Sequence, residues 1–159
     1  MLKGILARTA AMFGTMFSGG FQMDRKDLRA LSRVRLSEAR ALLKAGLPDG
    51  AYYLAGYAVE CALKACIAKA TQRYEFPEKK RVDASYTHNL EKLVETARLQ
   101  DEFLAAAKAD PLFRKYWNDV QEWSEQARYD KHSEQSARAL IEAIGDRNHG
   151  VMKWVKLYW

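Results

Sequence analysis

The chain has few of the residues that interrupt helices, with only 3 prolines and 9 glycines among its 159 residues. This scarcity favours helices over a sheet-rich fold with many turns. No apolar run approaches the about 18 residues of a membrane span, which argues against a membrane protein. Hydrophobic residues make up 48% of the chain and charged residues 29%, which is typical of a folded domain rather than of a disordered chain. The length fits a single domain.

Cysteine and histidine are also scarce. Cys61 and Cys66 are the only cysteines, and on a helix their five-residue spacing directs them to different faces. They can therefore neither form a disulfide with each other nor share a metal, and free thiols fit a reducing cytoplasm. The 3 histidines have no metal-ligand spacing, and no glycine-rich phosphate loop or nucleophile motif occurs. We expect no metal and no cofactor.

The net charge of +6 is unevenly distributed along the chain. Residues 1–45 hold nine basic and three acidic residues, whereas the remainder holds seventeen of each. Six cations lie on one face of the first expected helix: Arg25, Lys26, Arg29, Arg33, Arg40 and Lys44. Such a stripe is either a solvated helix face or a surface that contacts phosphates.

The first 22 residues differ in composition from the rest. They are mainly apolar and carry Lys3 and Arg8 but no acidic residue. Arg8 interrupts the apolar run and no clean cleavage site follows, so the segment is a poor secretory signal. We expect residues 1–22 to be a disordered leader, or a product of an upstream start codon, and residues 23–159 to form the domain.

Apolar residues recur at helical spacing along most of the chain. Asp24 is positioned to cap the first helix and Gly46 to end it. Helices are expected over residues 25–45, 51–72, 89–98, 102–108, 111–127 and from a cap at Ser133 to 144, with a last apolar segment from 151, and a surface loop is expected over 74–88. The helix over 51–72 is apolar nearly all round, which is typical of the buried centre of a bundle. The prediction is an all-α, antiparallel up-down bundle of four to five main helices.

Glu60 and Lys64 are the only charged residues within the central segment 51–68. Their spacing of four allows them to pair on a helix, and a buried carboxylate needs such a partner. Arg35 falls within the apolar arc of the first helix and is a further candidate partner. The group is either a buried ion pair that fixes the packing of two helices or a polar cluster that faces a ligand cleft.

Two histidines could also take part in chemistry. His88 precedes an expected helix, where it either caps the helix or faces a ligand. His132 follows Arg128 by four residues, and an Arg and a His on one loop could bind a phosphate and move a proton. The same two residues could instead simply end a helix.

Several segments resemble the HEPN family (higher eukaryotes and prokaryotes nucleotide-binding domain). They are residues 39–43, the segment 49–65 that reads DGAYYLAGYAVECALKA, Thr87-His88-Asn89-Leu90, and Ala127-Arg128-Tyr129. The resemblance covers about residues 23–159. It implies a helical bundle that pairs as a homodimer, with roles in toxin–antitoxin systems, phage defence or RNA processing, often beside a nucleotidyltransferase partner.

Many members of that family are metal-independent ribonucleases with an Arg and a His as catalytic residues. Here only three residues separate Arg128 from His132, fewer than the family motif implies, so whether the protein is an enzyme stays open. We predict a cytoplasmic protein that binds RNA or a nucleotide, with Arg128 and His132 as the candidate catalytic pair. The predicted ligand-binding residues are Glu60, Lys64, His88, Arg128, Tyr129 and Tyr57. The alternative is a non-catalytic module that binds a protein partner through an exposed aromatic patch, with Trp117, Trp123, Trp154 and Trp159 available to form it.

Overall fold

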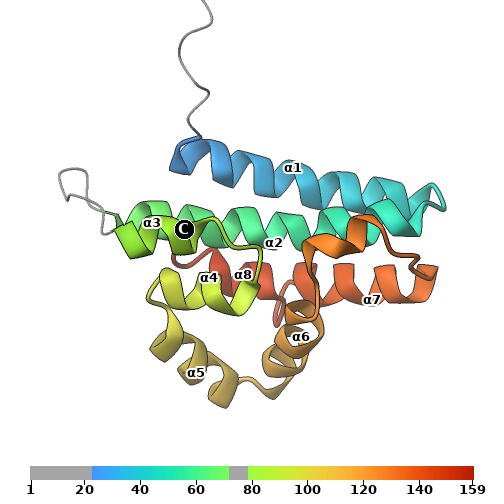
Figure 1. Cartoon of the computed structure of the whole chain (residues 1–159). Helices are drawn as coiled ribbons and strands as arrows, with labels where there is room; N and C mark the ends of the chain where they lie inside the picture. The colour runs from blue at the N-terminus through green and yellow to red at the C-terminus, as the bar shows by residue number, and fades with distance from the viewer. Residues whose placement is uncertain (1–22, 72–78) are drawn as a thin grey trace, which may run out of the picture.

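The computed structural model describes residues 23–71 and 79–159, and within these ranges the chain is helical and has no strand. The elements are α1 (Arg25–Lys44), α2 (Pro48–Ala70), α3 (Lys79–Ser85), α4 (Leu90–Thr96), α5 (Gln100–Ala109), α6 (Pro111–Gln121), the 3₁₀ helix η1 (Glu125–Arg128), α7 (Glu134–Gly145) and α8 (Val151–Val155). Figure 1 shows the long helices α1 and α2 side by side and antiparallel. The expected all-α bundle is confirmed. The predicted leader, residues 1–22, lies outside the described ranges.

The first two helices begin and end where local sequence signals place them, with one difference. The Asp24 side chain accepts from the Asp27 backbone N–H at 2.8 Å, and the Asp27 side chain accepts from Asp24 N–H at 3.1 Å. This reciprocal cap fixes the start of α1. Gly46 has a φ of +75°, the left-handed conformation that glycine adopts readily after a helix. Helix α2 begins at Pro48, three residues earlier than predicted, because proline needs no N–H partner in a first turn.

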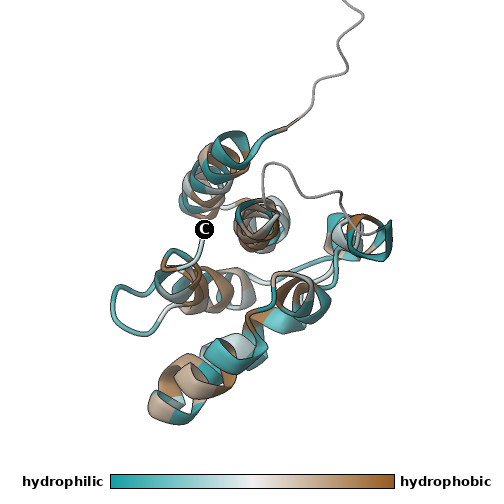
Figure 2. Ribbon diagram, turned by 90° about the vertical axis from the view of Figure 1, so that its left-hand side faces the viewer, coloured by the Kyte–Doolittle hydropathy of each residue, from teal (hydrophilic) through white to brown (hydrophobic). Residues whose placement is uncertain are grey.

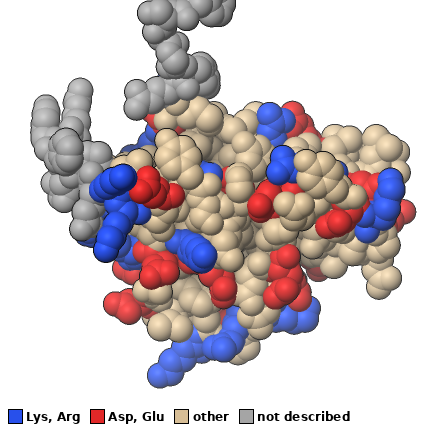
Figure 3. Space-filling view, viewed as in Figure 1, with Lys and Arg blue, Asp and Glu red and all other residues tan. Residues whose placement is uncertain are grey.

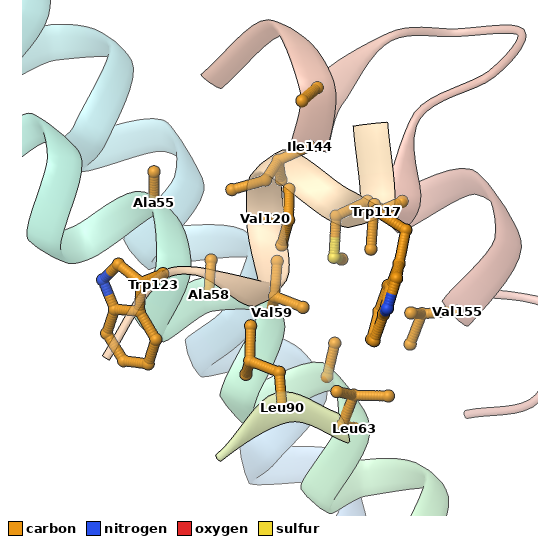
Figure 4. Packing of buried hydrophobic residues seen from close by; sticks show 14 of the residues in the cluster. Ala55, Ala58, Val59, Leu63, Leu90, Trp117, Val120, Trp123, Ile144 and Val155 are labelled. Carbon is orange, nitrogen blue, oxygen red and sulfur yellow. The ribbon is translucent and has the colours of Figure 1, made fainter. Parts of the chain in front are cut away.

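Helix α2 is the centre of the bundle. Figure 2 looks along this helix and shows it surrounded by the others. Helices α1, α4, α7 and α8 and η1 all pack against it. Its small residues allow α1 to approach closely, and Ser32 Oγ donates to the Ala58 carbonyl at 2.7 Å. In Figure 4, Val59 and Leu63 lie among Leu90, Val120 and Val155 in the core. Within the described ranges, no helix combines the length and apolar character needed to cross a membrane.

Two predicted boundaries are wrong. The expected surface loop over 74–88 contains helix α3, which has no buried residue and packs against α4. Residues 72–78 lie outside the described ranges. The helix expected over 111–127 ends at Gln121 and is followed by η1, with Ser124 in an extended conformation between them. The chain leaves the axis of α6 there and brings Trp123 against α2, a tertiary contact that overrides the local helical pattern.

The tryptophans do not form an exposed patch. Trp117 and Trp123 are 2% exposed, and Trp154 and Trp159 are 6% exposed. Trp117 and Trp154 pack with Phe103 and Phe113 in an aromatic cluster whose ring centroids lie 5.1 to 6.2 Å apart. The sequence-based interpretation of these tryptophans as a partner-binding surface is therefore wrong, because the bundle uses all four rings to fill its interior.

Candidate functional site

One face of α2 carries most of its polar and aromatic side chains. These residues recur at spacings of three and four, which places them on one side of a helix: Asp49, Tyr52, Tyr53, Tyr57, Glu60 and Lys64. The segment before α4 and the segment around η1 both contact α2, and in Figure 1 both cross in front of it. This face, called the α2 face below, therefore has a histidine-bearing segment at each end. Figure 3, viewed as Figure 1, shows basic and acidic side chains interspersed over this side of the molecule.

Glu60, Lys64 and His88 form a cluster at the Lys64 end of the α2 face. The Glu60 side chain is 2% exposed, and its Oε1 accepts from Lys64 Nζ at 2.9 Å. The Nδ1 atom of His88 lies 3.0 Å from both carboxylate oxygens. A carboxylate oxygen accepts, so Nδ1 is the donor in this contact, and among the described residues Nε2 has no hydrogen-bond partner. The structure thus brings together three of the residues that the sequence assigned to one site.

Local capping holds His88 in place. Asn89 is the N-cap of α4, and its side chain accepts from Lys92 N–H at 2.9 Å. The Thr87 hydroxyl accepts from Asn89 N–H at 3.2 Å, and Leu90 is buried in the core. The backbone on both sides of His88 is therefore fixed, while its side chain remains 45% exposed. A histidine with an anchored backbone, an oriented ring and an open edge is well placed to bind or to exchange protons.

The predicted pairing of Arg35 with Glu60 is wrong. The Arg35 guanidinium pairs with Glu38, one turn away on the same helix. The Glu60 carboxylate instead accepts from Lys64 Nζ and from His88 Nδ1. The sequence could not reveal the His88 contact, because it joins segments 28 residues apart through the packing of α4 on α2.

Arg128, Tyr129 and Tyr57 are also placed on this side of α2, but apart from the cluster. The Arg128 guanidinium lies 5.1 Å from the centre of the neighbouring Tyr129 ring, and Tyr129 is 74% exposed. Tyr57 is half-buried and stacks on Tyr53 with a centroid distance of 6.1 Å. Among the described residues, no hydrogen bond or ion pair joins Arg128 or Tyr129 to Glu60.

His132 is held by residues other than Arg128. Its ring stacks on Tyr52 with centroids 3.7 Å apart, and its backbone N–H donates to Asp49 Oδ1 at 2.7 Å. That N–H, followed by the Lys131 ammonium, lowers the pKa of Asp49. The Nε2 atom of His132 is buried and has no partner among the described residues. The side chain therefore forms part of the packing at one end of the α2 face.

One histidine–aspartate pair could not be predicted from the sequence. His149 has no evident partner in the sequence, yet its Nδ1 lies 2.8 Å from Asp110 Oδ2. Asp110 also caps α6 by accepting from Leu112 and Phe113 N–H. An aspartate directly before a proline at a helix start indicates the cap, but nothing in the sequence indicates the histidine, which lies 39 residues away.

The residues in the described ranges offer no evident metal centre. No group of three or more His, Cys, Asp or Glu side chains is placed there to hold an ion. Cys61 and Cys66 are free and buried. Burial raises the pKa of the Cys61 thiol to about 11 and that of the Cys66 thiol to about 12. Both thiols are therefore protonated and poor nucleophiles at neutral pH.

Comparison with known proteins adds a family to this geometry. A family model described as HEPN domain matches residues 26–158, which is nearly the whole chain. No curated protein and no solved structure matches the chain significantly. The family match covers α2, the Glu60 cluster, η1 and α7 together. The chain belongs to the HEPN domain family, and this membership supports a nucleotide- or RNA-related role in general.

Proposed function

We propose that the protein binds RNA or a nucleotide on the α2 face. One observation carries this proposal: a carboxylate that is 2% exposed, Glu60, holds Lys64 and His88 side by side at the edge of the molecule. A buried ion pair often adds no more stability than apolar residues of the same volume would, so the arrangement needs a reason beyond packing. Orienting two donors towards an anionic ligand would provide that reason.

The residues of the α2 face have separable roles in this proposal. Lys64 and Arg128 contact phosphate, because both are cations and Arg can bind a phosphate through two parallel hydrogen bonds. Tyr57 and Tyr129 provide rings on which a base can stack. Glu60 does not touch the ligand but holds Lys64 in place. Arg128 lies on its own segment, so the ligand has to bridge from η1 to the Glu60 cluster.

Binding is tested with labelled RNA and with nucleotides at low salt, where electrostatic contacts are strongest. We expect Lys64→Ala/Arg128→Ala to weaken binding at least tenfold, and Lys108→Ala/Arg114→Ala, which removes two exposed cations elsewhere, to leave it unchanged. Because Lys64 partners a buried carboxylate, Arg128→Ala/Tyr129→Ala serves as a second test that perturbs only exposed side chains. Unchanged affinity in both site variants would exclude the α2 face.

Ribonuclease activity is a separate question, with Arg128 and His132 as the predicted catalytic pair. Metal-independent cleavage needs a base and an acid near the 2′-hydroxyl and the scissile phosphate. The assay compares cleavage of labelled RNA by the wild type, Arg128→Ala and His132→Ala. Equal cleavage by all three would exclude this pair. Since His132 Nε2 is buried, we add His88→Ala, whose open imidazole is the better placed acid–base group.

We further propose that the protein works in the cytoplasm in a two-protein toxin–antitoxin or phage-defence system, with a nucleotidyltransferase-type partner and a second copy of itself. The family membership supports this context. Light scattering after size exclusion tests the homodimer, and co-expression with the product of the neighbouring gene tests the partner. The alternative is a partner-binding module without a ligand, but the tryptophans predicted to form its surface are buried. A stoichiometric protein complex without any affinity for nucleic acid would still favour it.

A further inference from the structure

The basic stripe of α1 is organised around one buried ring. Arg25, Arg29 and Arg33 follow one another at four-residue steps, so that their Cα atoms lie about 6 Å apart along the helix. All three reach Trp159, which is 6% exposed. In Figure 2 the end of the chain lies directly beside α1. These three cations are therefore not freely solvated, whereas Lys26, Arg40 and Lys44 of the same stripe are exposed.

The contacts to Trp159 hold the cations in fixed positions. Arg25 donates from a terminal nitrogen to the Trp159 carbonyl oxygen at 2.6 Å. The guanidinium carbons of Arg29 and Arg33 lie 5.2 and 5.0 Å from the centre of the indole ring, and Lys156 Nζ lies 5.9 Å from it. These are cation–π distances, and each reduces the freedom of a long side chain.

Arg29, Arg33 and Lys156 have no acidic side chain as a partner. None of these three forms a salt bridge with an Asp or Glu within the described ranges. The two acidic residues of α1 are engaged elsewhere, because Asp27 belongs to the helix cap and Glu38 pairs with Arg35. Positive charges held around one ring repel each other, so an anion bound beside them is stabilised.

We infer that Arg29, Arg33 and Lys156 form a contact surface for successive phosphates of an RNA strand, on the side of the molecule away from the α2 face. This inference rests on the proposed function, since it takes RNA as the ligand. Arg25 positions the Trp159 backbone and is not itself a contact. In Figure 2, the chain end marked C lies on one side of α2 and α3 on the other, which separates the two surfaces.

The chemistry of the cations favours phosphates over bases. A guanidinium over the face of a ring still has N–H groups in its own plane that can donate to phosphate oxygens in pairs. The Trp159 ring is buried beneath the cations and cannot stack on a base. Three cations held around one ring suit a polymer that presents several phosphates close together, so binding should be independent of base sequence.

The test measures how the affinity for short fluorescein-labelled oligouridylate and oligoadenylate depends on salt, between about 50 and 200 mM. Each phosphate contact with a single strand contributes about 0.7 to the slope of log K against log salt. We expect Arg29→Gln/Arg33→Gln/Lys156→Gln to reduce that slope by about 2 with both oligonucleotides. The matched control, Lys108→Gln/Arg114→Gln/Arg147→Gln, removes the same charge from exposed sites elsewhere and should change the slope by less than half as much.

The possible outcomes separate this inference from the proposed function. If the wild type binds RNA and the triple variant keeps the wild-type slope, the inference is wrong and the α2 face can still be right. If only the triple variant loses affinity and the α2-face variants do not, the inference stands without the proposed site. No RNA binding by the wild type, or tighter binding of polyglutamate than of RNA, would overturn it. Should the triple variant unfold, Arg33→Gln alone, at an exposed position, must lower the slope by about 0.7.

Discussion

Substitution of Gly56 by alanine should test how tightly the α2 face is built. A Cβ atom at this position would lie 2.2 Å from Trp123 Cγ and 2.3 Å from its Cδ1 and Cδ2 atoms. Carbon atoms pack best at about 3.5–4.0 Å, so the indole would have to retreat by about 1.3 Å. Trp123 is 2% exposed and also packs against Tyr53, which leaves it little room to move.

Two opposing terms set the size of the effect. Overpacking a core costs about 1–3 kcal/mol. Replacing glycine by alanine within a helix gains about 1 kcal/mol. We therefore expect Gly56→Ala to lower the free energy of unfolding by up to about 2 kcal/mol in the wild type. In a Trp123→Ala background the clash is absent, and the same substitution should stabilise the protein by about 1 kcal/mol.

The assay is urea unfolding followed by far-ultraviolet circular dichroism, since Trp123 is absent from two of the variants. The coupling between the two positions should be about 1–3 kcal/mol. Trp117→Ala provides the matched control, because it removes another buried indole that does not contact Gly56. If Gly56→Ala changes stability equally in the wild-type and Trp123→Ala backgrounds, the packing described for this face is refuted.

Three further predictions concern the cluster, a helix cap and the thiols. Glu60→Gln should lower the free energy of unfolding by about 1–3 kcal/mol, because a buried charged acceptor is lost; urea titration measures this, and the exposed Glu95→Gln should have no effect. The pKa of Asp110 is held below its ordinary 3.8, first by the N–H groups of the helix that it caps and then by the His149 imidazole. The stabilising contribution of ionised Asp110 is therefore fully present above pH 3.8 and is lost as the pH falls through the lower pKa of the folded state. The difference in urea midpoint between wild type and Asp110→Asn should accordingly shrink below about pH 4. Burial raises the pKa of Cys61 to about 11 and that of Cys66 to about 12; a thiol reagent at neutral pH should react only as the protein unfolds, and rapid labelling of the native protein would contradict this.

The sequence predicted the features that depend on local patterns. The apolar central helix, the Asp24 cap and the Gly46 stop follow from residue type and spacing, and the structure has them where expected. The pairing of Glu60 with Lys64 was also predictable, because both lie on one helix at a fixed spacing. The site could be anticipated to the extent that it is built from one element.

The contacts between distant segments could not be predicted in this way. Glu60 finds His88 rather than Arg35, and Trp123 leaves the helical pattern to cover Gly56. In each case the partner is chosen by how two elements pack, and hydrophobic periodicity contains no information on that choice. Trp159 is the extreme example, since its carbonyl meets Arg25 across 134 residues. A sequence pattern identified the cations of α1 but not the ring that orders them.

The enclosure of α2 by five other elements has a consequence for how a ligand would be received. Tyr57, Glu60 and Lys64 lie on a helix that cannot shift without repacking the whole bundle, so little conformational entropy remains to be lost there on binding. Helix α3, in contrast, has no buried residue and packs mainly on α4. Any ligand-induced ordering on this side of the molecule should therefore be confined to α3, while the capped start of α4 keeps His88 in place. The Glu60 cluster is rigid before the ligand arrives, and only the helix beside it can adapt.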